Sequence, residues 1–177
     1  PLGGRDDEER PVYGGTPCDE SVLQAIANIQ GSGKEVMFYP FVLMDIPSGN
    51  GLADPYGWAE QGTFPWRGRI TASVAPGQAG TPDKTAAMLA EVTDFFGAAA
   101  VSDFAPTANG VNYSGPNEWS YRRFILHYAH LCAVAGGVEA FCIGSELRGL
   151  TTLRDGIESF PAVAALRALA AGVRLVL

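Results

Sequence analysis

Residues 137–150 read GVEAFCIGSELRGL, an apolar run that is followed almost at once by a carboxylate, Glu146. Residues 138–143 have the length and composition of a buried strand. Gly136 and Gly137 join this strand to a helical pattern before it, and so short a link is typical of βα units. The stretch therefore predicts a parallel sheet, with Glu146 just past the carboxyl end of one strand.

Four helices are predicted from apolar residues that recur at helical spacing. Thr-Pro pairs open the first two, because proline fits the first turn of a helix, and glycines close the first three. The stretches are 16–34, 81–97, 114–137 and 159–173.

A second strand is expected within residues 35–47, EVMFYPFVLMDIP, which are almost continuously apolar. Such a strand is usually covered on both faces, and Pro40 indicates a bend in it. A short hairpin is expected to turn at Asn109-Gly110. The repeated order of helix, glycine and strand predicts an α/β fold, for which a barrel and an open doubly wound sheet both fit.

The composition fits one globular domain, since 47% of the 177 residues are hydrophobic. Residues 1–15, with the charged run RDDEER, are expected to form a flexible or loop segment. The net charge of −7 argues against binding to nucleic acid. We expect no membrane span, since no apolar stretch is long enough. Pro1 and the apolar end at Leu177 indicate a fragment of a longer protein.

Glu146 has three interpretations from sequence: a helix cap, an ion-pair partner of Arg148 or Arg154, or a catalytic acid. In parallel barrels the carboxyl ends of the strands build the active site, which favours the third. Asp45 ends the other strand, so it either faces the same opening or caps a loop before Pro47.

The long loop 47–80 carries Tyr56, Trp58 and Trp66. These aromatic side chains fit two roles, stacking on sugar rings or forming a lid that packs on the core. His127 and His130 are spaced to share a helix face, but packing or hydrogen bonding explains them better than a metal site. We expect no metal, and no cofactor either, because no GxGxxG or GxxxxGK[ST] motif follows a strand.

Three cysteines lie at positions 18, 132 and 142. Their odd number and irregular spacing favour free, buried thiols over a disulfide framework.

Several motifs resemble the TIM-barrel-like domain of gene transfer agent and phage tail-tip proteins of alphaproteobacteria. The longest is EWSYRRFILHYAHLCAVAGGVEAFCIGSELRGLTTLRD at residues 118–155, followed by FPAVAALRALAAGVR at 160–174. WRGRI at 66–70 and GTPDKTAAMLAEVTDFFG at 80–97 resemble the same family. The likeness runs from about Tyr13 to the carboxyl terminus.

The resemblance implies a partial TIM (β/α) barrel over residues 16–177, truncated at both ends and similar to barrel glycoside hydrolases. It places Glu146 at the acid/base position. It also implies that the first strand and the later strands, one of which would carry the partner carboxylate, lie outside this chain. We therefore expect no turnover by this chain alone. Ser145 departs from the pattern, since many barrel glycosidases have an asparagine there that contacts the sugar 2-hydroxyl.

By the same resemblance, the protein would be made in the cytoplasm and assembled into the tail or baseplate of a phage-like particle. Its partners would be other tail proteins and a bacterial surface glycan. Recognition of that glycan, with or without hydrolysis, is the expected function. A glycan-binding module without turnover and a purely structural tail hub domain are the alternatives. Besides Glu146, the candidate glycan-binding residues are Asp45, Tyr56, Trp58, Trp66, Ser145 and Arg148.

Overall fold

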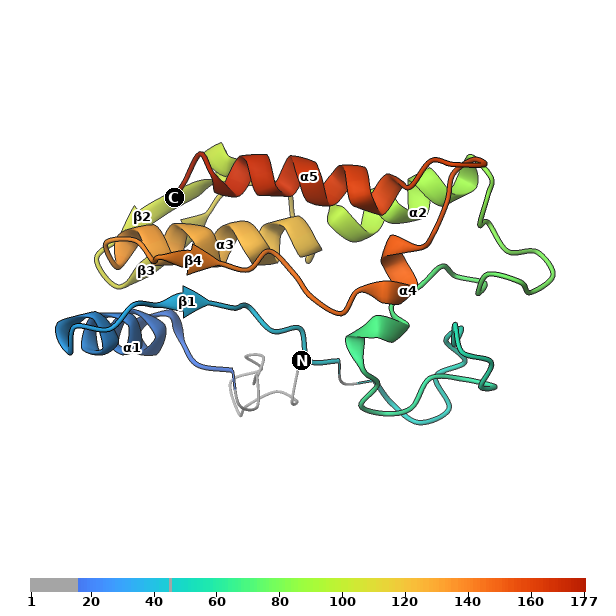
Figure 1. Cartoon of the computed structure of the whole chain (residues 1–177), viewed down its shortest axis with the longest axis horizontal. Coiled ribbons are helices and arrows are strands. Elements are labelled where there is room, and N and C mark those ends of the chain that lie inside the picture. The colour runs from blue at the N-terminus through green and yellow to red at the C-terminus, as the bar shows by residue number, and fades with distance from the viewer. Residues whose placement is uncertain (1–15, 45) are drawn as a thin grey trace.

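The computed structural model describes residues 16–44 and 46–177, an assembly of five helices, two short 3-10 turns and two small sheets within those ranges (Figure 1). The helices are α1 (Asp19–Gly31), α2 (Ala87–Phe96), α3 (Tyr121–Val134), α4 (Arg148–Thr151) and α5 (Pro161–Val173). The strands are β1 (Met37–Phe38), β2 (Phe104–Thr107), β3 (Gly110–Tyr113) and β4 (Ala140–Phe141), and the 3-10 turns are η1 (Arg67–Arg69) and η2 (Val101–Asp103). None of these helices has the length and apolar character that crossing a bilayer requires.

The four predicted helices are all present, but the first two begin later than their Thr-Pro pairs. The residue before the first turn of α1 is Cys18, which is exposed, so the expectation that all three thiols are buried is wrong. Lys84 has a φ of 68°, outside the helical range, so residues 81–86 form turns before α2 starts. In α3 the Ser120 hydroxyl accepts a hydrogen bond from the backbone N–H of Arg123 and caps the helix.

The strand pattern is much shorter than the sequence predicts. β1 and β4 form a two-stranded parallel sheet in which Met37 pairs with Ala140 and Phe38 pairs with Phe141. Phe38 and Phe141 stack on each other and pack toward α3, whereas Met37 is 72% exposed. The expected strand covered on both faces is therefore wrong, because over the described residues β1 has one neighbouring strand and one packed face. No closed barrel is formed by the described residues, although the helices and parallel pair fit an α/β fold.

The predicted hairpin is confirmed. β2 and β3 pair antiparallel, with Thr107 opposite Gly110. The two turn residues are Ala108 and Asn109, one position earlier than the sequence pattern indicates.

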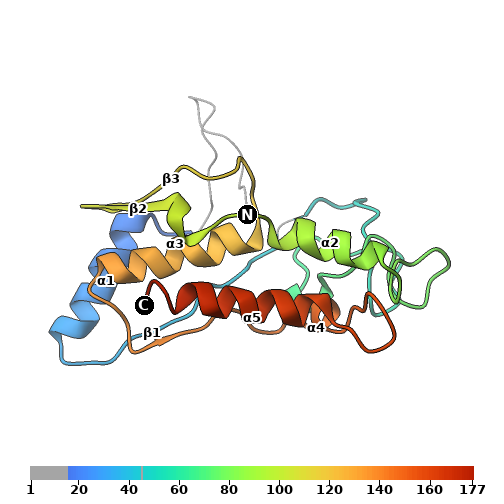
Figure 2. The same ribbon diagram turned by 90° about the horizontal axis from the view of Figure 1, so that it is seen from above.

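The hydrophobic core is centred on α3, which packs against α2, α5 and the hairpin. Figure 2 shows α3 and α5 running side by side. Ile125 and Leu126 on α3 are fully buried, as is Leu169 on α5. A second, smaller cluster joins the opposite side of α3 to α1 and β1 through Ile26, Val36 and Leu131. These contacts orient β1 and β4, and both strands point toward the region of α4 and η1.

Candidate functional site

The carboxyl ends of β1 and β4 lead into two segments that pack against each other, α4 and η1 (Figure 1). Gly149 in α4 makes this approach possible. A Cβ atom there would lie 2.6 Å from the backbone oxygens of both Gly68 and Ile70, so a larger residue would separate the segments. The close packing brings residues after β4 next to residues of the long loop after β1.

Glu146 lies at this junction in a strained backbone conformation. Its φ is 56°, a left-handed value that residues other than glycine rarely adopt. Its carboxylate Oε2 lies 2.5 Å from Arg67 Nη2 and accepts a hydrogen bond of 3.1 Å from Trp66 Nε1. The side chain is still 51% exposed. A half-exposed carboxylate is thus held in one orientation by an ion pair and a hydrogen bond.

Glu146 is therefore an ion-pair partner, as one of the three interpretations expected. Its partner is Arg67 and not Arg148 or Arg154. Arg154 pairs with Asp83, and over the described residues no ion pair joins Arg148 to Glu146. The cap interpretation is wrong, because Leu147 is the residue that precedes the first turn of α4.

Arg67 is the centre of the group, with a side chain only 7% exposed. Its Nε donates to the Ser145 carbonyl at 3.1 Å, and Nη2 donates to the Ser145 hydroxyl at 3.1 Å and to the Tyr39 hydroxyl at 2.7 Å. The guanidinium carbon lies 3.8 Å from the centre of the Phe41 ring. We call Tyr39, Phe41, Trp66, Arg67, Ser145 and Glu146 the Glu146 cluster.

A second group, the Arg69 stack, adjoins it and consists of Asp54, Tyr56, Trp58 and Arg69. The Arg69 guanidinium pairs with the buried Asp54 carboxylate and lies 4.9 Å from the Tyr56 ring centre and 4.5 Å from that of Trp58. Tyr56 also stacks on Trp66, with ring centres 6.2 Å apart.

The three loop aromatics do not share one environment. Tyr56 and Trp66 stack on each other but remain 42% and 44% exposed, and neither packs on the hydrophobic core of the described residues as a lid would, whereas Trp58 lies against Arg69 and is 63% exposed.

The other sequence candidates fall outside this arrangement or at its edge. Arg148 is exposed at the start of α4, and Asp45 lies outside the described residues. His127 pairs with Asp19 at 2.8 Å, which links α3 to α1. His130 is buried and stacks on Phe104, and burial lowers its pKa. Both histidines are thus packed or hydrogen-bonded, as expected.

The sequence interpretation missed Tyr39, Phe41, Arg67, Arg69 and Asp54. The signal for two of them was present in WRGRI, where the two basic residues of the loop 47–80 follow a tryptophan. Glu118 lies before the Ser120 cap and accepts hydrogen bonds from the backbone N–H groups of Ala98 and Ala99, so its role is to join two segments.

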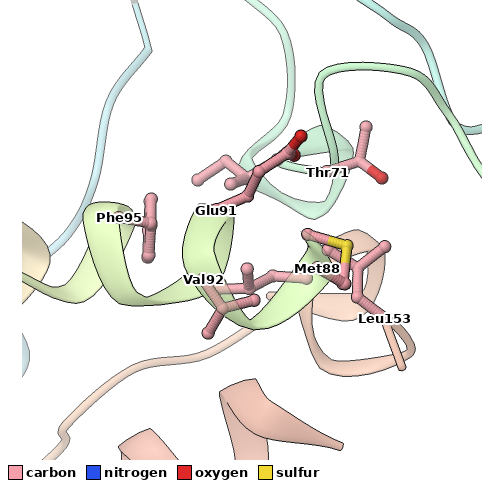
Figure 3. A pocket seen from close by; sticks show the side chains of 8 residues that line it. Thr71, Met88, Glu91, Val92, Phe95 and Leu153 are labelled. Atoms are coloured by element: carbon pink, nitrogen blue, oxygen red, sulfur yellow. The ribbon is translucent and has the colours of Figure 1, made fainter. Parts of the chain in front are cut away.

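A small cavity of about 70 Å³ lies between α2 and the segment after η1 (Figure 3). Met88, Val92 and Leu153 give it an apolar wall, and Glu91 and Thr71 lie at its rim. Glu91 is already used, because it accepts hydrogen bonds from the Ser73 backbone and hydroxyl. The cavity does not include Glu146, so we treat it as separate from the candidate site.

Part of the chain is similar to a known protein family. Residues 119–177 match the family model of the GTA TIM-barrel-like domain, where GTA denotes gene transfer agent. The matched segment contains α3, β4, Glu146, α4 and α5. No curated protein matches the chain. The match covers about a third of the chain, and the carboxyl-terminal segment that contains β4 and Glu146 is therefore similar to that domain.

Proposed function

We propose that the Glu146 cluster and the Arg69 stack together bind a bacterial surface glycan, and that the protein does so as part of the tail of a gene transfer agent. The observation that carries the proposal is Glu146 itself, half exposed and held at a φ of 56° by Trp66 and Arg67. Strained backbone of this kind costs about 1–3 kcal/mol and is concentrated at functional sites.

The chemistry of the surface suits a sugar. A pyranose ring offers an apolar C–H face to an aromatic ring and hydroxyl donors to a carboxylate. Trp58 supplies an exposed indole whose position is set by Arg69, and Glu146 supplies an oriented acceptor. Because Arg67 and Arg69 hold these two side chains in place, little ordering entropy is lost when a ligand binds.

Hydrolysis is a second candidate, favoured by the location of Glu146 just after a parallel strand. A glycosidase needs one carboxyl group to protonate the leaving oxygen and a second to act as nucleophile or base. Glu146 would have to leave its ion pair with Arg67 to carry that proton. Binding therefore needs only the geometry present in the chain, whereas hydrolysis needs a rearrangement and a further carboxylate.

The binding proposal is tested with Trp58→Ala and Trp119→Ala. Both tryptophans are exposed and both lie against an arginine, but Trp119 contacts Arg123, outside the proposed site. We expect Trp58→Ala to weaken binding of envelope polysaccharide from the producing bacterium about two- to tenfold, the range given by loss of an aromatic contact. Trp119→Ala should bind like the parent chain in isothermal titration calorimetry.

Equal affinities for the parent chain and the Trp58→Ala variant would contradict the proposal and favour a purely structural domain. Hydrolysis is tested separately, by product release from the same polysaccharide. Release that Glu146→Gln abolishes would support catalysis. Release at the same rate from both would remove Glu146 from a catalytic role.

A further inference from the structure

We infer that the surface around Glu146 discriminates glycans by charge, preferring sugars with a protonated amine over neutral sugars and neutral sugars over uronic acids. The inference rests on the proposed glycan-binding function and specifies the class of ligand. It follows from which member of each ion pair is exposed to a ligand.

In the Glu146 cluster the anion is exposed and the cation is hidden. The Glu146 side chain is 51% exposed, against 7% for Arg67. Arg67 also donates hydrogen bonds to Ser145 and Tyr39, and the Phe41 ring lies over its guanidinium. A ligand that reaches this cluster therefore meets a carboxylate first.

The Arg69 stack does not offer a ligand a positive charge that would outweigh the Glu146 carboxylate. Asp54 neutralises Arg69 from the buried side, and the rings of Tyr56 and Trp58 lie against the guanidinium. The Arg69 side chain is 17% exposed. Its contribution to a ligand is to position Trp58.

Within residues 16–44 and 46–177, the contacts of Glu146 leave one of its oxygens for a ligand. The contacts from Arg67 and Trp66 both fall on Oε2. Oε1 is thus the atom that can accept from a ligand, and an ammonium group with three donors suits it well. Because the pair would be solvent-accessible, the preference should be modest and should weaken as salt is added.

Among the described residues, Arg148 is a cation that could oppose this preference, because it is exposed two residues after Glu146. If its guanidinium dominated the surface, uronic acids would bind best and Arg148→Gln would remove that preference. Arg148→Gln is therefore included beside Glu146→Gln in the experiment.

The test uses oligosaccharides of one length built from glucosamine, from N-acetylglucosamine or from galacturonate. They are titrated into this chain at about pH 5, where the sugar amine is protonated and the uronic acid is ionised. We expect the glucosamine oligomer to bind about two- to fivefold tighter than the acetylated one at low salt. The galacturonate oligomer should bind most weakly. In Glu146→Gln the first two affinities should become equal, since the amide keeps the size and acceptor of the carboxylate without its charge.

Glu20→Gln is the matched control, because Glu20 is exposed on α1, at the opposite end of the molecule from α4. This variant changes the net charge equally and should keep the preference. Tighter binding of the galacturonate oligomer, or an unchanged preference in Glu146→Gln, would overturn the inference while leaving glycan binding intact. If none of the three oligomers binds, or if Trp58→Ala changes none of their affinities, the proposed glycan site itself fails and the inference fails with it.

Discussion

The indole Nε1 of Trp66 donates a hydrogen bond of 3.1 Å to Glu146 Oε2 across 80 residues of sequence. The same oxygen pairs with the neighbouring Arg67. Two consecutive loop residues therefore contact Glu146 in the segment between β4 and α4, where its backbone is left-handed. This junction, rather than the two-stranded sheet by itself, gives the candidate surface its shape.

Replacing Arg67 should destabilise the fold. Arg67→Ala leaves Ser145 and Tyr39 without their donor and Glu146 without its cation, which should lower the free energy of unfolding by about 2–3 kcal/mol. Arg67→Lys should recover only part of this loss, since an ammonium cannot reproduce the planar fork. Urea unfolding followed by circular dichroism measures both variants.

Arg148→Ala is the control for that comparison, because Arg148 is exposed, and it should change stability by no more than about 0.5 kcal/mol. Unfolding midpoints that coincide for Arg67→Ala and Arg148→Ala would show that Arg67 does not hold the junction together.

Gly149→Ala should destabilise the protein even though alanine is the better helix former. In an open helix the substitution stabilises by about 0.5–1 kcal/mol. Here the added methyl group meets two backbone oxygens of the segment 68–70, so we expect a loss of about 1–3 kcal/mol as α4 moves away from η1. Thermal unfolding gives the sign directly.

Gly156→Ala provides the comparison, because its added Cβ would meet only Ser159, at an ordinary 3.9 Å. It should change stability little. A Gly149→Ala variant as stable as the parent chain would mean that α4 and η1 do not pack as closely as described.

Substitution of the two loop tryptophans, Trp58 and Trp66, should affect stability to different extents. Trp66→Phe keeps an aromatic ring beside Tyr56 but loses the donor to Glu146, which should cost about 1 kcal/mol of stability. Trp58→Phe should change stability by less than about 0.5 kcal/mol, because Trp58 is mostly exposed. Chemical unfolding of the two variants under the same conditions makes the comparison, and equal losses would argue against the hydrogen bond to Glu146.

Acid should weaken the fold through His130. Burial lowers the pKa of this side chain below the ordinary 6.5, so the unfolded chain takes up a proton more readily than the folded one. The contribution of neutral His130 is complete above about pH 6.5 and is lost as the pH falls through the lowered folded value. Unfolding free energies measured across this window should decline toward acid.

His130→Phe keeps a ring against Phe104 and cannot titrate, so the decline over that window should become smaller. His127→Gln should retain it, because His127 lies at the half-exposed contact with Asp19 and leaves His130 in place. A decline of the same size in the parent chain and in His130→Phe would assign the pH dependence to other groups.

Much of the secondary structure could be predicted because its causes are local. The helices around Ile26, Val92 and Leu169 follow from apolar spacing, and these side chains are buried as that spacing requires. Helix starts were predicted less well, since Pro82 fits a turn as readily as a first helical turn. The predicted strands are longer than the observed ones. An apolar run indicates that residues tend to be buried, but it does not show how many neighbouring strands they pair with.

Individual residues of the candidate site could be predicted from the sequence, but their contacts could not. Glu146 follows from its position after an apolar run, and Trp66 follows from the aromatic loop. Their contact does not, because nothing local joins a loop at 66 to a strand end at 146. Arg148 and Arg154 were the expected partners on the ground of sequence distance alone, whereas Arg67 was overlooked because it is remote in the chain.

The sequence by itself determined roughly where four of the five described helices form, but not α4. It also indicated that parallel strands occur and that a carboxylate follows one strand, since each depends on neighbouring residues. Tertiary structure alone decided that Glu146 pairs with Arg67, that Trp66 donates to Glu146, and that β1 has one covered face. The physical reason is that these outcomes depend on contacts between segments far apart in the sequence. The covered face of β1 depends on β4 and α3, and the contacts of Glu146 depend on the close approach of α4 to η1. That approach comes from the absence of a side chain at Gly149 and from packing around α3, which no local pattern records.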